Sequence, residues 1–120
     1  MEENLTVDPK DFQDNKIMGI LAYFGPLVLV PIFAAKESPF ARYHSNQGLI
    51  LLILAIALGI VFNIIGRIIL AISLSLWFLT TLLSGLVWLG IGVFAIIGII
   101  NAVNGQMKEL PFIGKYKILK

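Results

Sequence analysis

The chain has 120 residues, of which 58% are hydrophobic and 13% are charged, with a formal net charge of +2 and no cysteine. This composition is far more apolar than that of soluble domains, and it predicts a single domain whose solvent is lipid. The lack of cysteine excludes disulfides, iron–sulfur clusters and thiolate chemistry, and no basic stripe indicates a nucleic-acid partner.

Residues 1–16 form a polar, acidic segment with Pro9 near its centre. We predict an N-terminal tail here, with Asp14 or Asn15 available to cap the first helix. A cleaved signal peptide is not expected, because acidic residues stand where such a leader would carry basic ones.

Residues 17–35 form the first apolar run, bounded by Lys16 and Lys36. At about 1.5 Å per residue it barely matches the thickness of a bilayer's hydrocarbon core. Pro26 and Pro31 each remove a backbone hydrogen bond, so a regular helix cannot run through this segment. We favour a membrane span kinked by proline, and a re-entrant hairpin buried against the other helices is the open alternative.

The next part of the chain contains a helix start and then a very long apolar run. Ser38 and Pro39 supply a hydroxyl cap followed by proline at the first helical position. From Leu49 to Ile100 the only ionisable side chain is Arg67. This run is too long for one span of about 20 residues and too short for three spans with their turns. We predict two helices, near residues 49–71 and 78–103, separated by a turn near residues 73–77.

The last helix is followed by Asn104 and Gly105, a C-terminal cap pattern, and Pro111 then prevents the helix from resuming. Residues 106–120 form a basic C-terminal tail that suits either an anionic bilayer surface or a solvated end. The predicted fold is all-α: an integral membrane helical bundle over residues 17–105, with about three transmembrane helices, the first kinked by proline.

Small residues recur on one side of each of the two long helices when positions advance at about 100° per residue. Helices in lipid associate through close backbone approach and occasional hydrogen bonds, so these sides are candidate contact faces. Packing within the chain, packing with another copy or partner, and lining a path all remain open. The predicted helix-contact face comprises Gly48, Ala55, Gly59, Asn63 and Gly66, together with Gly92, Ala95, Gly98 and Ala102.

Two polar features stand out against this apolar background. Arg67 lies toward the far end of its helix, where it could anchor at the interface or pair with a lipid phosphate or with Asn63. A single histidine without cysteine or paired carboxylates falls short of a metal or acid–base site. We therefore predict no catalytic, cofactor or metal site, and an interfacial polar cluster made of Arg42, His44, Asn46 and Gln47.

Three stretches together resemble a known family: Glu37–Gly48 before a span, Asn101–Gly105 after one, and Leu110–Lys115 near the end. In this combination the chain from Ile17 to Lys120 resembles the small prokaryotic membrane proteins of unknown function related to the Tic-type channel component of the chloroplast inner-envelope import translocon. The resemblance implies an all-helical, multi-span protein of a prokaryotic cytoplasmic membrane, without known catalytic residues.

These observations predict a small non-enzymatic multi-pass membrane protein that acts as a subunit or scaffold in a homo- or hetero-oligomeric membrane complex. The alternative is an oligomeric conduit or translocon-like channel component, which would need polar residues along several spans. The expected partners are the lipid bilayer with its anionic headgroups, and either another copy of the chain or another membrane protein. Nucleic acid is not expected.

The distribution of cations predicts an orientation in the cytoplasmic (inner) membrane. With three spans, the connection after the first span and the C-terminal tail share one side, and together they carry most of the lysines and Arg42. The N-terminal tail carries only Lys10 and Lys16. The positive-inside rule then puts the N-terminus outside and the C-terminus in the cytoplasm, whereas a re-entrant first segment would put both termini on one side.

Overall fold

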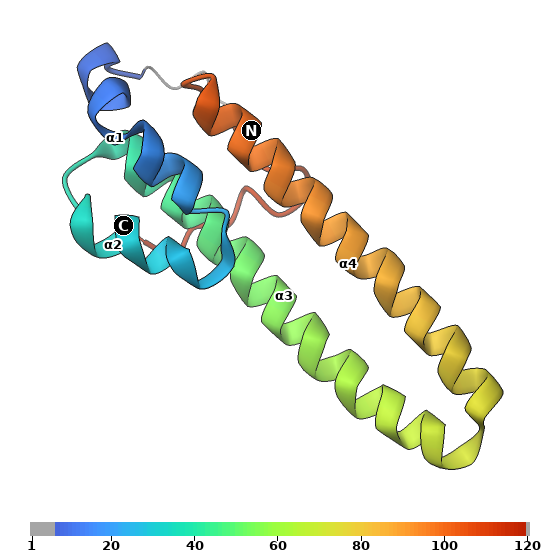
Figure 1. Ribbon diagram of the computed structural model, residues 1–120. Helices are drawn as coiled ribbons and strands as arrows, with labels where there is room; N and C mark the ends of the chain where they lie inside the picture. Colours follow the sequence, from blue (N-terminus) through green and yellow to red (C-terminus); the bar gives the residue numbers. More distant parts are fainter. Residues whose placement is uncertain (1–6, 120) are drawn as a thin grey trace.

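The computed structural model describes residues 7–119, and its regular elements in this range are all helical. They are α1 (Pro9–Leu21), the 3₁₀ helix η1 (Gly25–Val28), α2 (Leu29–Ala34), α3 (Pro39–Ile72) and α4 (Leu74–Val103). Helices α3 and α4 form a long antiparallel hairpin, and α1 and α2 pack against one end of it (Figure 1). We call this the proximal end. The predictions made for residues 1–6 of the N-terminal tail and for Lys120 fall outside the described residues.

The long helix α3 starts where the sequence predicts. Ser38 has extended backbone dihedrals, and its hydroxyl accepts a hydrogen bond from the Ala41 N–H at 3.0 Å. Pro39 occupies the first helical position, where a missing N–H costs nothing. The helix then runs for 34 residues, or about 51 Å, which exceeds the thickness of the hydrocarbon core. Its first turns, from Phe40 to Gly48, are mostly buried within the protein instead.

One extended residue, Ser73, separates α3 from α4. Its φ and ψ of −156° and 121° break the helix, and its hydroxyl accepts from the Leu76 N–H at 3.3 Å to cap α4. Serine suits this position because its side chain replaces a backbone acceptor that the first helical turn lacks. The expected spans 49–71 and 78–103 lie within α3 and α4.

The first apolar run, residues 17–35, is not a membrane span, so the expected three spans are corrected to two. Helix α1 ends at Leu21, the chain turns at Gly25 with φ of +62°, and α2 has six residues. The physical reason is local: Gly25 adopts a left-handed conformation that ends a helix, and Pro26 cannot donate the hydrogen bond that would continue one. Within residues 7–119, α3 and α4 are the two helices long and apolar enough to cross a membrane.

The start of the first helix also differs from expectation. Helix α1 begins at Pro9, and Asp8 is its cap, accepting a hydrogen bond from the Lys10 N–H at 3.2 Å. Asp14 and Asn15, the residues expected to cap a helix starting near residue 17, lie inside α1 instead. Asn15 marks a kink there, with non-helical dihedrals.

The buried core lies at the proximal end. Side chains from α1, η1, α3, α4 and the C-terminal segment meet there, whereas the large apolar side chains further along the hairpin face outward. The isolated chain thus buries one end and leaves the rest of the hairpin for lipid or protein to cover. The core comprises Ala22, Tyr23, Val28, Phe40, Leu51, Ala102 and Leu110.

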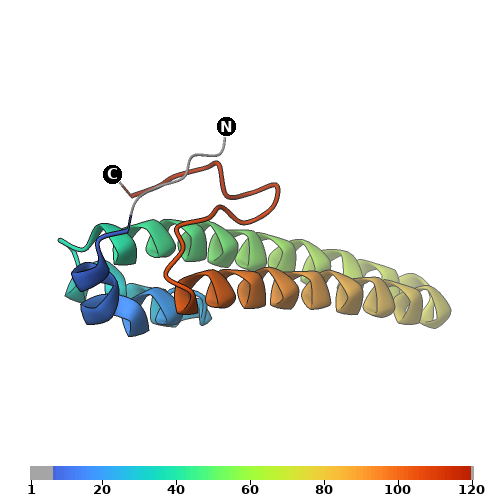
Figure 2. The same cartoon turned by 90° about the horizontal axis from the view of Figure 1, so that it is seen from above.

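Both ends of the described chain lie at the proximal end. After α4 the chain crosses α3 and finishes beside the first turns of that helix (Figure 2). The described segments before α3 and after α4 thus lie at the same end of the hairpin. The expectation that the termini face opposite sides depended on a third span, and the orientation in a membrane stays a prediction.

Candidate functional site

A buried polar network fastens the C-terminal tail to the start of α3. Gln47, fully buried, donates from Nε2 to the Gly114 carbonyl and accepts from the Leu110 N–H through Oε1, both at 2.8 Å. A Cβ at Gly114 would lie 2.6 Å from Gln47 Oε1 and 2.5 Å from Leu110 N, so only glycine fits this approach. One amide side chain thus satisfies two main-chain groups of a segment that has no helix or strand partner.

Asn46, on the preceding position of α3, holds the end of the tail in the same way. Its Oδ1 accepts from the N–H groups of Ile118 and Leu119 at 3.0 and 2.6 Å, and its Nδ2 donates to the Leu119 carbonyl at 3.1 Å. An amide side chain has both donors and acceptors, which matches the mixed polarity of a backbone.

His44 links α3 to two further segments. Its Nδ1 lies 2.7 Å from the Tyr23 hydroxyl, and its Nε2 lies 2.9 Å from the Gln106 carbonyl oxygen. A carbonyl can only accept, so Nε2 carries the proton, and the neutral ring accepts from Tyr23 at Nδ1. Burial raises the pKa of the Tyr23 hydroxyl, which keeps it protonated for this donation. We call Tyr23, His44, Asn46 and Gln47 the polar cap cluster.

The structure brings three of the four residues of the predicted interfacial cluster into this network. Arg42, the fourth, lies on the same turns of α3 and is half-buried. Their partners Tyr23, Gln106 and Gly114 were not predicted from the sequence. Most of these partners contribute main-chain atoms, which leave no side-chain signal in a sequence.

The predicted small-residue faces serve several different contacts. A Cβ at Gly48 would collide with the Ala22 carbonyl, and a Cβ at Gly98 would collide with the Tyr23 ring, so both glycines admit the turn after α1. Gly59 faces Trp88, and a Cβ at Gly59 would lie 3.4 Å from the indole ring.

The remaining small residues of the predicted faces lie in different surroundings. Ala102 is fully buried in the core. Ala55, Gly92 and Ala95 line an apolar cavity of about 110 Å³, whereas a Cβ at Gly66 would meet nothing within 4 Å.

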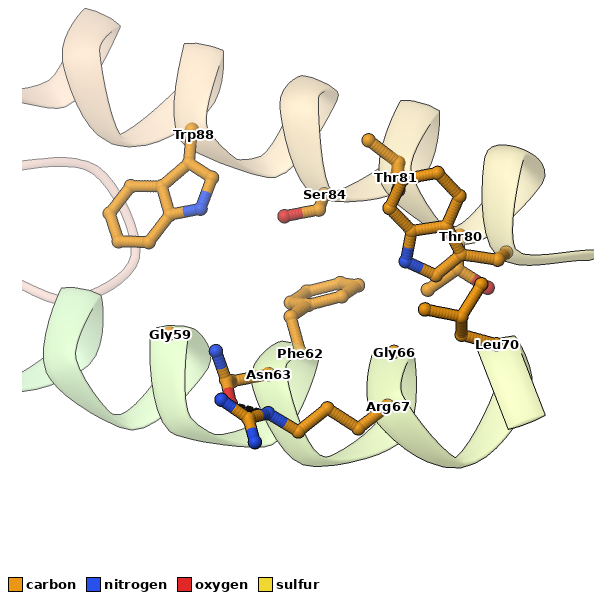
Figure 3. A pocket seen from close by; sticks show the side chains of 11 residues that line it. Gly59, Phe62, Asn63, Gly66, Arg67, Leu70, Thr80, Thr81, Ser84 and Trp88 are labelled. Atoms are coloured by element: carbon orange, nitrogen blue, oxygen red, sulfur yellow. Dashed lines mark hydrogen bonds between the residues drawn. The ribbon is translucent and has the colours of Figure 1, made fainter. Parts of the chain in front are cut away.

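A second polar region lies between α3 and α4, toward the turn that joins them. It is a groove of about 320 Å³, which we call the distal groove. Arg67 extends along α3 and donates from Nε to Asn63 Oδ1 at 3.0 Å, while Ser84 and Trp88 project from α4 (Figure 3). The structure therefore pairs Arg67 with Asn63, which was one of the alternatives predicted from the sequence. The groove's polar and indole side chains are Asn63, Arg67, Trp77, Thr80, Thr81, Ser84 and Trp88.

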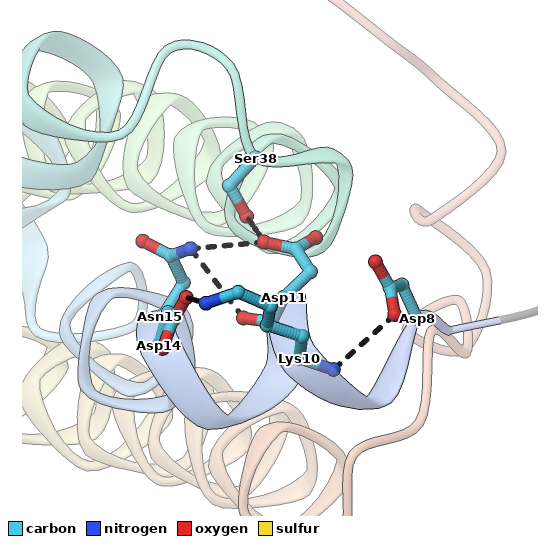
Figure 4. Close-up of polar contacts among 6 residues, drawn as sticks. All are labelled: Asp8, Lys10, Asp11, Asp14, Asn15 and Ser38. Carbon is cyan, nitrogen blue, oxygen red and sulfur yellow. Dashed lines mark hydrogen bonds and ion pairs between the residues drawn. The ribbon is translucent and has the colours of Figure 1, made fainter.

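A carboxylate joins α1 to the start of α3 at the proximal end. Asp11 accepts from the Ser38 hydroxyl at 2.5 Å and from the Asn15 amide at 2.9 Å (Figure 4). It also accepts from the Phe40 N–H at 3.0 Å. Burial raises the pKa of the Asp11 carboxyl, but these hydrogen bonds favour the carboxylate more, and the pKa is lowered overall. Lys10 pairs with Asp14 at 3.0 Å on the exposed side of α1, and this hydrogen-bonded pair raises the pKa of Lys10.

Within residues 7–119, no group of three or more His, Cys, Asp or Glu side chains lies together as metal ligands would. Both ring nitrogens of His44 are already hydrogen-bonded. The arrangement is suited to holding segments of the protein together at one end and to presenting polar groups in a membrane groove at the other.

Comparison with known proteins gives one family. Searches of curated proteins and of solved structures each gave no significant match. The model of the magnetosome magnetite crystal formation protein family, MamF/MmsF, matches residues 15–117. The predicted relationship to proteins related to the Tic-type channel component is therefore wrong. Two of the stretches that suggested it, Glu37–Gly48 and Leu110–Lys115, form the proximal end and its tail. Their residues are therefore explained by packing within the protein. The match spans nearly the whole chain and includes both long apolar helices, and the chain belongs to the MamF/MmsF family of magnetosome membrane proteins.

Proposed function

We propose that this protein is a small non-enzymatic subunit that acts as a scaffold in an oligomeric membrane complex. The observation that carries the proposal is the exposure of the hairpin: beyond the proximal core, most of the large apolar side chains of α3 and α4 are exposed. Two helices cannot enclose an interior, so lipid or other chains must cover these faces. The fastened proximal end supplies a rigid platform on which such an assembly can be built.

The family description supports a place for that assembly. It associates the family with magnetite crystal formation in magnetosomes. We propose that this chain lies in a prokaryotic membrane of that kind, with its proximal end in the cytoplasm, and contributes to crystal formation as a structural subunit. The described residues offer no grouped metal ligands, so the proposal gives the folded part no direct role in binding iron.

The distal groove supports the alternative function, a conduit, less well than the exposed hairpin supports a scaffold. Its polar residues lie between Gly59 and Trp88, in the part of the hairpin far from the proximal end. The cavity nearer the proximal end is lined almost entirely by apolar side chains. A continuous polar path across the membrane would need polar groups in both halves.

The absence of cysteine allows a direct test of association between copies. Single substitutions Ile60→Cys and Leu86→Cys place thiols on the exposed faces of α3 and α4, respectively. Oxidation in native membranes should link copies at one of these faces and spare the other, because a specific interface uses one surface. The cross-linked mass, compared with the mass of the unmodified protein in mild detergent, should give the number of copies.

The matched control is Phe112→Cys, which places a thiol on the exposed tail outside the hairpin. Equal cross-linking at all three positions would indicate random collision. No cross-linking at either helix face, together with a monomeric mass and no stably co-purifying chain, would overturn the scaffold proposal.

A further inference from the structure

Arg67 points along α3 toward the proximal end rather than toward the α3–α4 turn (Figure 3). Its Cα lies 18 residues beyond Leu49, or about 27 Å along α3, close to the far edge of a hydrocarbon core of about 30 Å. Side chains on a helix tilt toward its N-terminus. In Arg67 this direction is fixed by the hydrogen bond to Asn63, one turn earlier. The guanidinium therefore lies beside Asn63, about one turn from the Arg67 Cα, where it lines the distal groove.

Among residues 7–119 the guanidinium has no acidic side chain as a partner. The sequence has no acidic residue between Glu37 and Glu109. Every acidic side chain in residues 7–119 belongs to the proximal end or its tail, and the molecule is 57 Å long. Another copy inserted in the same orientation would carry these acidic residues at that same end. The described part of the chain thus leaves the charge of Arg67 available to an anion from outside the protein.

The groove around Arg67 has the chemistry of a phosphate site. Arg67 has five N–H donors in a fixed fork, and the structure shows one of them, on Nε, bonded to Asn63. Thr81 and Ser84 add hydroxyl donors on the facing helix, and the volume of about 320 Å³ leaves room for a headgroup. Guanidinium groups bind phosphate through paired, charge-assisted hydrogen bonds. Tryptophan prefers the level of the headgroups, and Trp77 lies at the end of the groove nearest the turn.

We propose that the distal groove binds the phosphate of an anionic glycerophospholipid from the leaflet that faces the α3–α4 turn. The phosphate pairs with Arg67 and the hydroxyls of α4, and the acyl chains lie along the exposed apolar faces of the hairpin. Lipid binding at this site does not depend on the oligomeric state, so it can be tested separately from the scaffold proposal.

The test uses the full chain in nanodiscs of phosphatidylglycerol or of phosphatidylcholine. Native mass spectrometry counts the lipids retained per chain, and thermal unfolding in detergent measures the effect of added phosphatidylglycerol. Arg67→Gln should weaken phosphatidylglycerol binding by about 10- to 100-fold, the range expected for losing charged hydrogen bonds. Lys108→Gln removes an exposed charge at the proximal end and should leave the binding unchanged.

Two further variants keep the test decisive if Arg67→Gln does not fold. Arg67→Lys keeps the charge but loses the forked geometry, and should bind with intermediate affinity. Thr81→Val keeps the shape of the groove but loses a hydroxyl, and should weaken binding without changing the helical content. Equal retention of phosphatidylglycerol in all the variants, or equal loss in Lys108→Gln, would overturn the proposal. Inorganic phosphate alone producing the same Arg67-dependent stabilisation would assign the groove to a soluble anion instead of a lipid.

Discussion

Single side chains at the proximal end take the place that a strand or helix partner would have elsewhere. Residues 104–119, the described part of the tail after α4, have no regular secondary structure, so their buried main-chain groups need partners. His44, Asn46 and Gln47 supply them, bonding six main-chain groups between Gln106 and Leu119. The polar residues before the first long span thus determine where the last residues of the chain lie.

Gln47→Met should release the tail and destabilise the protein. The change keeps the size of the side chain but leaves the Leu110 N–H and the Gly114 carbonyl without a partner, at a cost of about 1–3 kcal/mol each. Thermal unfolding in detergent should shift to lower temperature, and trypsin should cleave faster after Lys115 and Lys117. Gln106→Met is the control, because that side chain is exposed. Equal effects of the two substitutions would show that Gln47 does not fasten the tail.

Asp11 should make the stability of the protein depend on acid pH. Its pKa is lower in the folded protein than in the unfolded chain, so its contribution is fully present above the unfolded value, about 3.9, and is lost as pH falls through the lower folded value. Asp11→Asn should therefore lower the unfolding temperature at pH 7, and this difference from the original protein should shrink below about pH 4. A difference that stays constant between pH 7 and pH 3 would contradict the ionic role of Asp11.

At the scale of elements, the close approach of the turn after α1 to the hairpin depends on two glycines. The Ala22 carbonyl occupies the space that a Cβ at Gly48 would need, and the Tyr23 ring occupies the space beside Gly98. The ring cannot simply move away, because it is buried and its hydroxyl is bonded to His44. These contacts hold the first apolar segment against the membrane hairpin.

Gly48→Ala should separate α1 from α3. The added methyl group meets backbone, which cannot rotate away as a side chain can, so the cost should reach or exceed the usual overpacking range of about 1–3 kcal/mol. Thermal unfolding in detergent measures the loss. Gly85→Ala is the matched control, since a Cβ there meets nothing within 4 Å and alanine favours helix. Stability equal to that of the control variant would mean that α1 does not pack on α3 as described.

At the scale of the whole molecule, two spans gather the charges at one end. Apart from Arg67, all the lysines and arginines lie before Leu49 or after Val103 in the sequence. The turn between α3 and α4 carries no charge. The positive-inside rule therefore favours a cytoplasmic proximal end more strongly than it favoured any orientation with three spans, because the two sides no longer compete.

Reporters fused to either terminus should both be active in the cytoplasm. A thiol introduced at the turn by Ser75→Cys should react with an impermeant reagent added from the opposite side, since this residue is exposed next to the start of α4. The unmodified chain, which has no cysteine, gives the background of the labelling. Termini on opposite sides, or labelling of Ser75→Cys from the cytoplasm, would contradict the two-span topology.

Local sequence determined the features that depend on neighbouring residues. The apolar run after Leu49 specified two helices long and apolar enough to cross a membrane, and the caps at Ser38 and Ser73 follow from a hydroxyl placed before a helix. The same hydropathy led to a third span at residues 17–35, because an apolar run does not by itself distinguish a span from a segment packed on other helices.

Tertiary structure alone decided what the polar residues do. His44 meets a carbonyl 62 residues away, Gln47 one 67 residues away and Asn46 one 73 residues away. Their partners are main-chain atoms, which every residue carries, so no sequence pattern predicts these contacts. The direction of the Arg67 side chain along α3 was likewise fixed by the tilt of helical side chains toward the N-terminus and by the hydrogen bond to Asn63, since hydropathy gives the depth of a residue but not the direction of its side chain.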